Sequence, residues 1–136
     1  MKHNLTIQTL SAGIFLSLAV VLYSCGGGGL YGGNGAGMTT APGAFALSSP
    51  ADGATGTGAT PTLTWTPSTS AANYRVQIDT AGTFTGTLVV NVLGGATTYS
   101  YMVSASTLTL GTPYFWRVIA ENIYGQAVVG PRSFTP

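Results

Sequence analysis

The chain is poor in charge and lacks most of the side chains that carry out acid-base chemistry. Charged residues make up 5% of its 136 residues. After residue 24 neither lysine nor histidine occurs, and the charges that remain cancel, being Arg75, Arg117, Arg132, Asp52, Asp79 and Glu121. A neutral segment without a basic cluster has no electrostatic footprint for nucleic acid or anionic lipid. Nucleic acid is therefore not expected as a partner.

Cysteine is equally scarce, because Cys25 is the only one. A single cysteine excludes an intrachain disulfide framework, so an apolar core has to stabilise the fold. Without histidine, lysine or a second cysteine after residue 24, the usual general bases, activated nucleophiles and metal ligands are missing together. We therefore expect no enzymatic activity, no metal and no cofactor.

The first 24 residues have the order of a secretory signal. Lys2 and His3 form a weakly basic start, and an almost unbroken apolar run of 12 residues follows from Ala12 to Tyr23. A helix that crosses about 30 Å of hydrocarbon needs roughly 20 apolar residues, so a permanent span is the weaker interpretation. The pattern favours a signal peptide over residues 1–24.

The apolar run closes in a motif that resembles the lipobox of bacterial lipoprotein precursors, namely Leu22, Tyr23, Ser24 and Cys25. The resemblance implies that Cys25 receives a diacylglyceryl group and that the chain is cleaved just before it. Two or more acyl chains make such an anchor durable, since a single chain holds only reversibly. It also implies a location in the bacterial cell envelope, and Gly26 favours the outer membrane of a Gram-negative cell. An ordinary cleaved signal and an uncleaved anchor are the alternatives.

Residues 25–43 are expected to hold the acylated cysteine and a flexible linker. Residues 26–43 contain nine of the 20 glycines and no charge. About 18 such residues span roughly 24 Å as a random coil. A glycine-rich phosphate loop is disfavoured, because no strand precedes the segment and no helix or lysine follows it.

From Ala44 onward, short alternating segments are separated by turn residues, and none has a helical period. The alternation over 62–65, 74–79 and 114–121 gives each segment one apolar face. Further strands are expected over 88–92 and 99–103. Asp52 and Gly53 indicate a turn rather than a calcium loop, since one carboxylate makes a poor calcium site. The pattern predicts one all-β domain over residues 44–136.

One segment of this domain resembles the turn that leads into strand F of fibronectin type III domains. Its family positions are filled by Leu108, Gly111, Thr112 and Tyr114, and residues 61–67 and 73–79 resemble strands B and C of that family. The resemblance implies a single antiparallel seven-stranded immunoglobulin-like β-sandwich, in which Tyr114 forms a tyrosine corner. Leu110 and Pro113 depart from the family pattern.

Alternation within these strands predicts a core built from Trp65, Tyr74, Val76, Ile78, Leu108, Tyr114, Trp116 and Val118. Phe115 and Ile119 then project from the other face of their strand, and Tyr124 lies in the loop between strands F and G. These three residues are the candidate partner surface. The fold also implies that the loops 68–72 and 122–126 face the linker.

Strands C and F are antiparallel neighbours in the family, so Asp79 and Glu121 are expected at opposite ends of the sheet. A glycosidase carboxylate pair needs a separation of roughly 5 to 10 Å, which this placement excludes. If Arg75 faces Glu121, then Asp79 faces Arg117. This register predicts two ion pairs on the outer face, each contributing about 0.2 to 1 kcal/mol.

Taken together, the sequence predicts a membrane-anchored cell-envelope lipoprotein that presents a non-enzymatic fibronectin type III-like module for binding or adhesion. Its partners would be the membrane, through the lipid, and an unknown protein or glycan. A purely structural subunit of an envelope or surface assembly is one alternative. A carbohydrate-associated accessory module is another, although a sugar platform needs exposed rings, whereas Trp65, Tyr114 and Trp116 alternate inward.

Overall fold

The structure is a computed structural model that describes residues 39–136. The predicted signal peptide, the lipobox residues Leu22, Tyr23 and Ser24, the acylation site Cys25 and the linker as far as residue 38 lie outside the described residues. Residues 39–136 contain β-strands and no helix, so the prediction of an all-β domain is confirmed. Correspondingly, this part of the chain has no helix long and apolar enough to cross a membrane.

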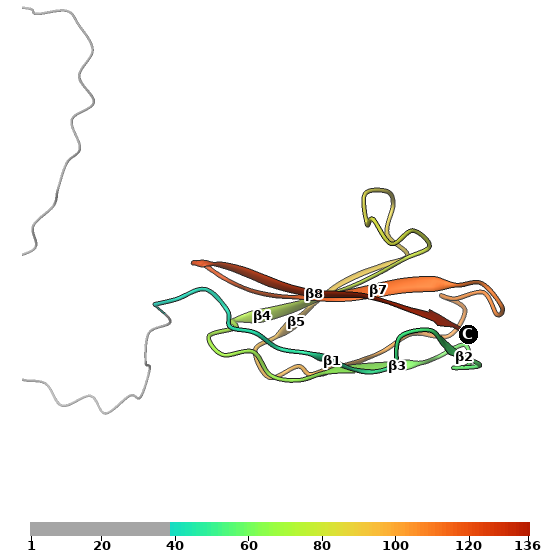
Figure 1. The fold of residues 1–136 in the computed structure, drawn as a ribbon, viewed down its shortest axis with the longest axis horizontal. Helices are drawn as coiled ribbons and strands as arrows, with labels where there is room; N and C mark the ends of the chain where they lie inside the picture. The colour runs from blue at the N-terminus through green and yellow to red at the C-terminus, as the bar shows by residue number, and fades with distance from the viewer. Residues whose placement is uncertain (1–38) are drawn as a thin grey trace, which may run out of the picture. The chain divides into compact units, whose positions relative to one another are not determined.

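Eight strands make up the domain: β1 (Leu47–Ser49), β2 (Ala54–Thr55), β3 (Thr62–Trp65), β4 (Asn73–Asp79), β5 (Val90–Gly95), β6 (Ser100–Met102), β7 (Tyr114–Asn122) and β8 (Gly125–Thr135). They form two sheets that face each other as a β-sandwich (Figure 1). The smaller sheet has the order β1-β3-β6 and the larger one the order β2-β8-β7-β4-β5.

Strand number and direction differ from the sequence-based expectation of seven antiparallel strands. The additional strand is β2, whose residues Ala54 and Thr55 pair in parallel with Phe134 and Thr135 of β8. All other pairs are antiparallel. A strand of two residues is too short to show an alternating pattern, so only the tertiary pairing reveals it.

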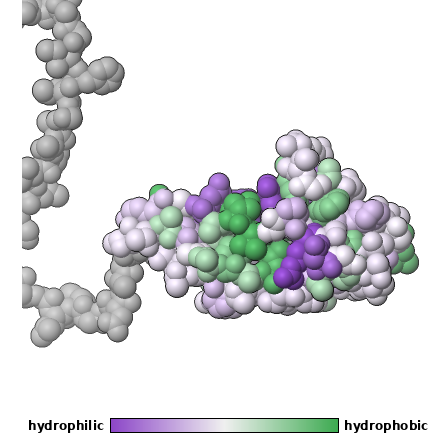
Figure 2. All heavy atoms as spheres, in the orientation of Figure 1, coloured by the Kyte–Doolittle hydropathy of each residue, from purple (hydrophilic) through white to green (hydrophobic). Residues whose placement is uncertain are grey.

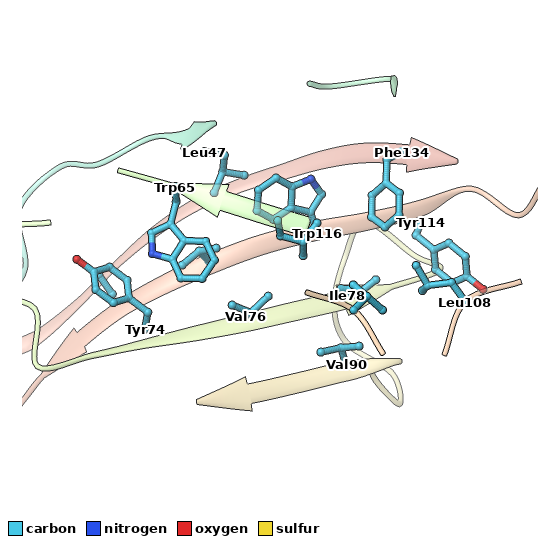
Figure 3. Close-up of a cluster of buried hydrophobic side chains, with 14 of the residues drawn as sticks. Leu47, Trp65, Tyr74, Val76, Ile78, Val90, Leu108, Tyr114, Trp116 and Phe134 are labelled. Carbon is cyan, nitrogen blue, oxygen red and sulfur yellow. The ribbon is translucent and has the colours of Figure 1, made fainter. Parts of the chain in front are cut away.

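The core lies between the sheets and contains every residue predicted for it, namely Trp65, Tyr74, Val76, Ile78, Leu108, Tyr114, Trp116 and Val118. Trp116 is fully buried and lies between two groups of rings, one around Trp65 and Tyr74 and one around Tyr114 and Phe134 (Figure 3). The ring centroids of Trp65 and Tyr74 are 5.8 Å apart, and those of Tyr114 and Phe134 are 6.0 Å apart. Burial of large rings on this scale supplies much of the driving force for folding.

The predicted register of strands C and F is wrong by two residues. In the structure Arg75 pairs with Ile119, Gln77 with Arg117, and Asp79 with Phe115. A shift of two residues keeps every side chain on its predicted face, because successive side chains of a strand alternate. The alternating pattern therefore could not distinguish the two registers.

Residues at the end of the predicted linker form hydrogen bonds with the sandwich. The N–H of Gly43 donates to the carbonyl of Thr69 at 3.0 Å, and the hydroxyl of Ser68 donates to the carbonyl of Gly43 at 2.7 Å. Further back, the carbonyl of Thr40 accepts a hydrogen bond from Asn122 at 2.8 Å. The last residues of the predicted linker are thus attached to the sandwich.

Candidate functional site

The most exposed apolar side chain of the described domain lies at the tip of the β7–β8 hairpin. This hairpin turns through Ile123 and Tyr124, which are 89% and 51% exposed. Gly125 follows with φ near 149°, a conformation that side-chain-bearing residues rarely adopt. The tight turn therefore leaves both large side chains in solvent.

Asn122 holds this hairpin in place. Its side-chain amide nitrogen donates to the carbonyls of Thr40 and Ser70, at 2.8 and 2.7 Å. Its amide oxygen accepts a hydrogen bond from the N–H of Tyr124 at 2.8 Å. One side chain therefore joins three segments that are distant in sequence, and the hairpin tip is fixed before any partner arrives. Such preorganisation lowers the entropy cost of binding.

An open groove of about 460 Å³ lies beside the hairpin, lined by Ala72, Asn73, Glu121, Asn122, Ile123, Gly125 and Gln126. Asn73, Glu121 and Gln126 stand in one row across β4, β7 and β8. Ile123 contributes the exposed apolar surface. The groove thus combines an apolar edge with a row of hydrogen-bonding groups, the composition of a recognition site rather than of a catalytic one.

The charge in this groove is balanced internally. The carboxylate of Glu121 accepts a hydrogen bond from the guanidinium of Arg75 at 3.1 Å, with each side chain about a third exposed or less. They meet diagonally, because Glu121 is opposite Asn73 in the register. A partly exposed pair of this kind contributes about 0.2 to 1 kcal/mol. The groove therefore presents little net charge to a partner.

The predicted partner surface on the outer face of β7 is largely covered. Ile119 is only 7% exposed, since it has Arg75 and Val128 as neighbours on both sides. Phe115 is half-buried, and a Cβ on Gly82 would lie 3.4 Å from its ring. The loop between β4 and β5, which contains Gly82, rises from the outer side of the larger sheet (Figure 1). Among the three predicted surface residues, only Tyr124 is freely accessible.

The second predicted ion pair is absent. Within residues 39–136, no ion pair joins Asp79 and Arg117. The guanidinium of Arg117 instead donates to the side-chain carbonyl of Gln77 at 2.7 Å and lies 4.3 Å from the ring centre of Phe84. Asp79 is 4% exposed, and its Oδ2 has no hydrogen-bond partner in the described part of the chain. The register shift alone does not explain this, since Arg75 and Glu121 stand in the same diagonal relation and still pair. The guanidinium of Arg117 is instead directed to Gln77 and Phe84.

No acid-base centre emerges from the described residues. Asp79 and Glu121 lie at opposite ends of the β4–β7 pair, since Asp79 is opposite Phe115 while Glu121 is opposite Asn73. No group of three histidine, cysteine or acidic side chains gathers within residues 39–136. Asp52 and Gly53 form a turn, in which Asp52 accepts hydrogen bonds from the N–H and hydroxyl of Ser133 at 2.7 and 3.0 Å.

The sequence indicates neither that Ile123 belongs to the groove nor that Asn122 holds the hairpin in place. It does indicate Tyr124, because an aromatic residue in a loop is a common binding anchor. Ile123 stands directly before it, and its exposure follows from the two-residue turn. The hydrogen bonds of Asn122 depend on Thr40 and Ser70, which no local pattern connects to the hairpin.

Comparison with known proteins identifies no family. No protein-family model matches the chain, and no curated protein matches it. Among solved structures, the chain is similar to a Fn3-like protein from Clostridium thermocellum, with 18% identity, a TM-score of 0.47, and coverage of 71% of this chain and 91% of that one. A structure described as titin kinase and its flanking domains gives 26% identity, a TM-score of 0.37, and coverage of 70% and 16%.

Proposed function

We propose that this chain is a lipid-anchored protein of the bacterial cell envelope whose fibronectin type III-like sandwich acts as a non-enzymatic binding module. The observation that carries the binding role is the preorganised hairpin, which holds Ile123 and Tyr124 in solvent beside a groove of hydrogen-bonding side chains. The lipobox-like run ending at Cys25 supports the anchor. The fibronectin type III assignment is supported by the turn before β7, where the hydroxyl of Tyr114 accepts a hydrogen bond from the N–H of Thr109.

The geometry also indicates the chemistry of the partner. Ile123 and Tyr124 offer apolar and aromatic surface, while Asn73 and Gln126 offer amide groups, and the charge of Glu121 is matched by Arg75. A neutral protein surface with an apolar side chain and exposed backbone groups fits this arrangement. Sugar stacking is less well supported, because both tryptophans, the best stacking residues, are buried.

Binding is tested by a photo-crosslinking side chain placed at position 124 in cells. The matched control carries it at Leu110, which is 66% exposed near the start of β7 and thus at the opposite end of the sandwich. We expect a discrete adduct from position 124, which Ile123→Ser reduces at least tenfold. Equal adducts from both positions, or no adduct at 124, would contradict a binding role for the hairpin. Without irradiation, a stoichiometric complex that survives high salt in a pull-down from detergent extract would favour a structural subunit instead.

Anchoring is tested separately by metabolic labelling with a fatty acid. The intact protein should incorporate label, and Cys25→Ser should abolish it, because the thiol is the acceptor. Cys25→Ser should also move the protein from the membrane fraction to the soluble fraction. Equal labelling of both forms contradicts the anchor without bearing on the hairpin.

A further inference from the structure

Free sheet edges are hazardous, because their unpaired backbone groups attract strands from other chains, and natural proteins blunt them. Most edges of this sandwich are blunted. The pairing of β1 is irregular between Leu47 and Ser49, and Pro50 ends the strand. The edge strand β6 has only three residues. On the other side of the larger sheet, β8 is interrupted by a bulge near Gly130 and by Pro131, and β2 covers its last residues.

The edge strand β5 has none of these devices. Its six residues, Val90–Gly95, pair with β4 in an unbroken register and contain no proline and no charge. Val92 and Leu93 are 38% and 50% exposed. Since β5 ends the order of its sheet, no described strand pairs with its outer side. Alternate N–H and C=O groups of an antiparallel edge strand point outward and are available for pairing.

We propose that β5 is a strand-addition site whose occupant is β5 of a second copy of this chain. Antiparallel pairing of two identical edges across a twofold axis would join two five-stranded sheets into one continuous sheet. Each copy then supplies both the donors and the acceptors that the other needs. Val92 and Leu93 lie on opposite faces of the strand, so exposed apolar side chains would flank the new strand pair on both faces of the sheet.

Charge favours a second copy over a charged partner. The strand itself is neutral, and the charged side chains of the neighbouring strands are bonded within the sheet or buried. Arg75 pairs with Glu121, and Arg117 binds Gln77 and lies over Phe84. Asp79, the other charged residue of β4, is 4% exposed. Two identical β5 edges therefore bring no like charges together, and β5 offers no charge that would steer an ionic peptide to it.

The expected complex is a closed dimer of modest affinity. Six residues of edge bury less surface than a standard interface, for which about 1,600 Å² in total is typical. A twofold strand pair uses up both free edges, so assembly stops at two copies. This self-association does not depend on the lipid anchor or on the hairpin at Ile123.

The test is a cysteine scan of the full-length chain in detergent solution, in a Cys25→Ser background so that each variant carries one thiol. Cysteines are placed singly at the exposed positions Asn91, Val92 and Leu93. A strand pair brings only residues close to its twofold axis within disulfide distance, about 5.5 Å between Cα atoms. We expect mild oxidation to give a covalent dimer at one or two adjacent positions, with a steep decrease at the next. Fluorescence of the buried Trp65 and Trp116 reports whether each variant is folded.

Lysine substitutions provide a matched comparison in the cross-linking variant. Leu93→Lys places a charge on the proposed edge and should reduce covalent dimer at least fivefold. Val128→Lys is the control, because Val128 on β8 is 49% exposed and Leu93 is 50% exposed. Apolar surface also lies over β8 (Figure 2). This control should leave the dimer unchanged.

Three results would overturn the proposal. They are an absence of cross-links at all three positions in folded protein, an equal effect of the two lysine substitutions, and a ladder of covalent or non-covalent species larger than a dimer. Protection of the β5 amides only after another protein is added would point to a different occupant and would equally overturn it.

Discussion

Tyr114 folds back over the turn that precedes its own strand, and its hydroxyl accepts a hydrogen bond from the backbone N–H of Thr109 at 3.0 Å. The ring is 4% exposed and stacks on Phe134, while Leu108 is buried in the same core. The turn itself is tightened by Gly111 at φ near 75°. This contact ties the chain that crosses between the sheets to the start of β7.

The first prediction concerns this hydrogen bond. Tyr114→Phe keeps the ring but removes the acceptor, which leaves the N–H of Thr109 unpaired in a partly buried site. We expect the free energy of unfolding to fall by about 1 to 2 kcal/mol, measured by urea denaturation. Tyr124→Phe is the control, since its half-exposed hydroxyl can bind water. If both variants lose the same free energy of unfolding, the hydrogen bond between Thr109 and Tyr114 contributes nothing specific to stability.

The second prediction concerns the bulge in β8. Gly130 has φ near 118°, and a Cβ there would lie 2.9 Å from both the Cβ of Arg117 and the carbonyl oxygen of Trp116. Gly130→Ala should therefore destabilise the domain by more than about 2 kcal/mol, as backbone strain and a clash add. Gly86→Ala is the matched control, because an added Cβ meets nothing within 4 Å. Thermal denaturation compares the two variants, and similar melting temperatures would contradict the requirement for glycine at position 130.

The third prediction concerns the stability of the domain at acidic pH. The backbone N–H of Ser133, followed by its hydroxyl, holds the pKa of Asp52 below its ordinary value of 3.8. A lowered folded pKa means that the carboxylate contributes stability above the unfolded pKa. That contribution disappears as the pH falls through the folded value. The midpoint of urea unfolding should therefore decrease below about pH 4.

Asp52→Asn isolates this effect, because it keeps an oxygen acceptor for Ser133 but does not titrate. The difference in unfolding midpoint between wild type and variant should be constant near pH 6 and should shrink as the pH falls below 4. A difference that stays constant down to pH 2 would show that the charge of Asp52 has no part in stability.

The fourth prediction concerns Asn122. Asn122→Ala removes the hydrogen bonds to Thr40, Ser70 and Tyr124, and we expect it to cost about 1 to 3 kcal/mol. Amide hydrogen exchange at Tyr124 should accelerate at least tenfold, because its acceptor is gone. Gln126→Ala, an exposed neighbour in the groove, should change exchange at Tyr124 little. Unchanged exchange in Asn122→Ala would show that the hairpin is held by other contacts.

Much of the fold could be predicted because its signals are local. Alternation with a period of two identified β3, β4 and β7 nearly to the residue and placed Trp65, Val76 and Trp116 inward. The turn from Leu108 to Tyr114 was recognisable because its special positions are close together in sequence. These features depend on neighbours only a few residues away.

The candidate site was less predictable because its parts come from distant segments. Tyr124 was correctly placed in an exposed loop, but Ile119 is buried and Phe115 is partly covered by the loop that contains Gly82. A loop that folds over a sheet leaves no periodic trace in the chain. The groove needs β4, β7 and β8 together, so no single segment indicates it.

The sequence by itself determined which side chains face inward, since the alternation of polar and apolar residues is a property of each strand alone. Tertiary structure alone decided how the strands are aligned, because a two-residue shift preserves that alternation while placing Phe115 rather than Arg117 opposite Asp79. It likewise decided which edges are blunted and which one, that of β5, is left open. Strand order and register depend on contacts between residues far apart in the chain, and these contacts have no local signature.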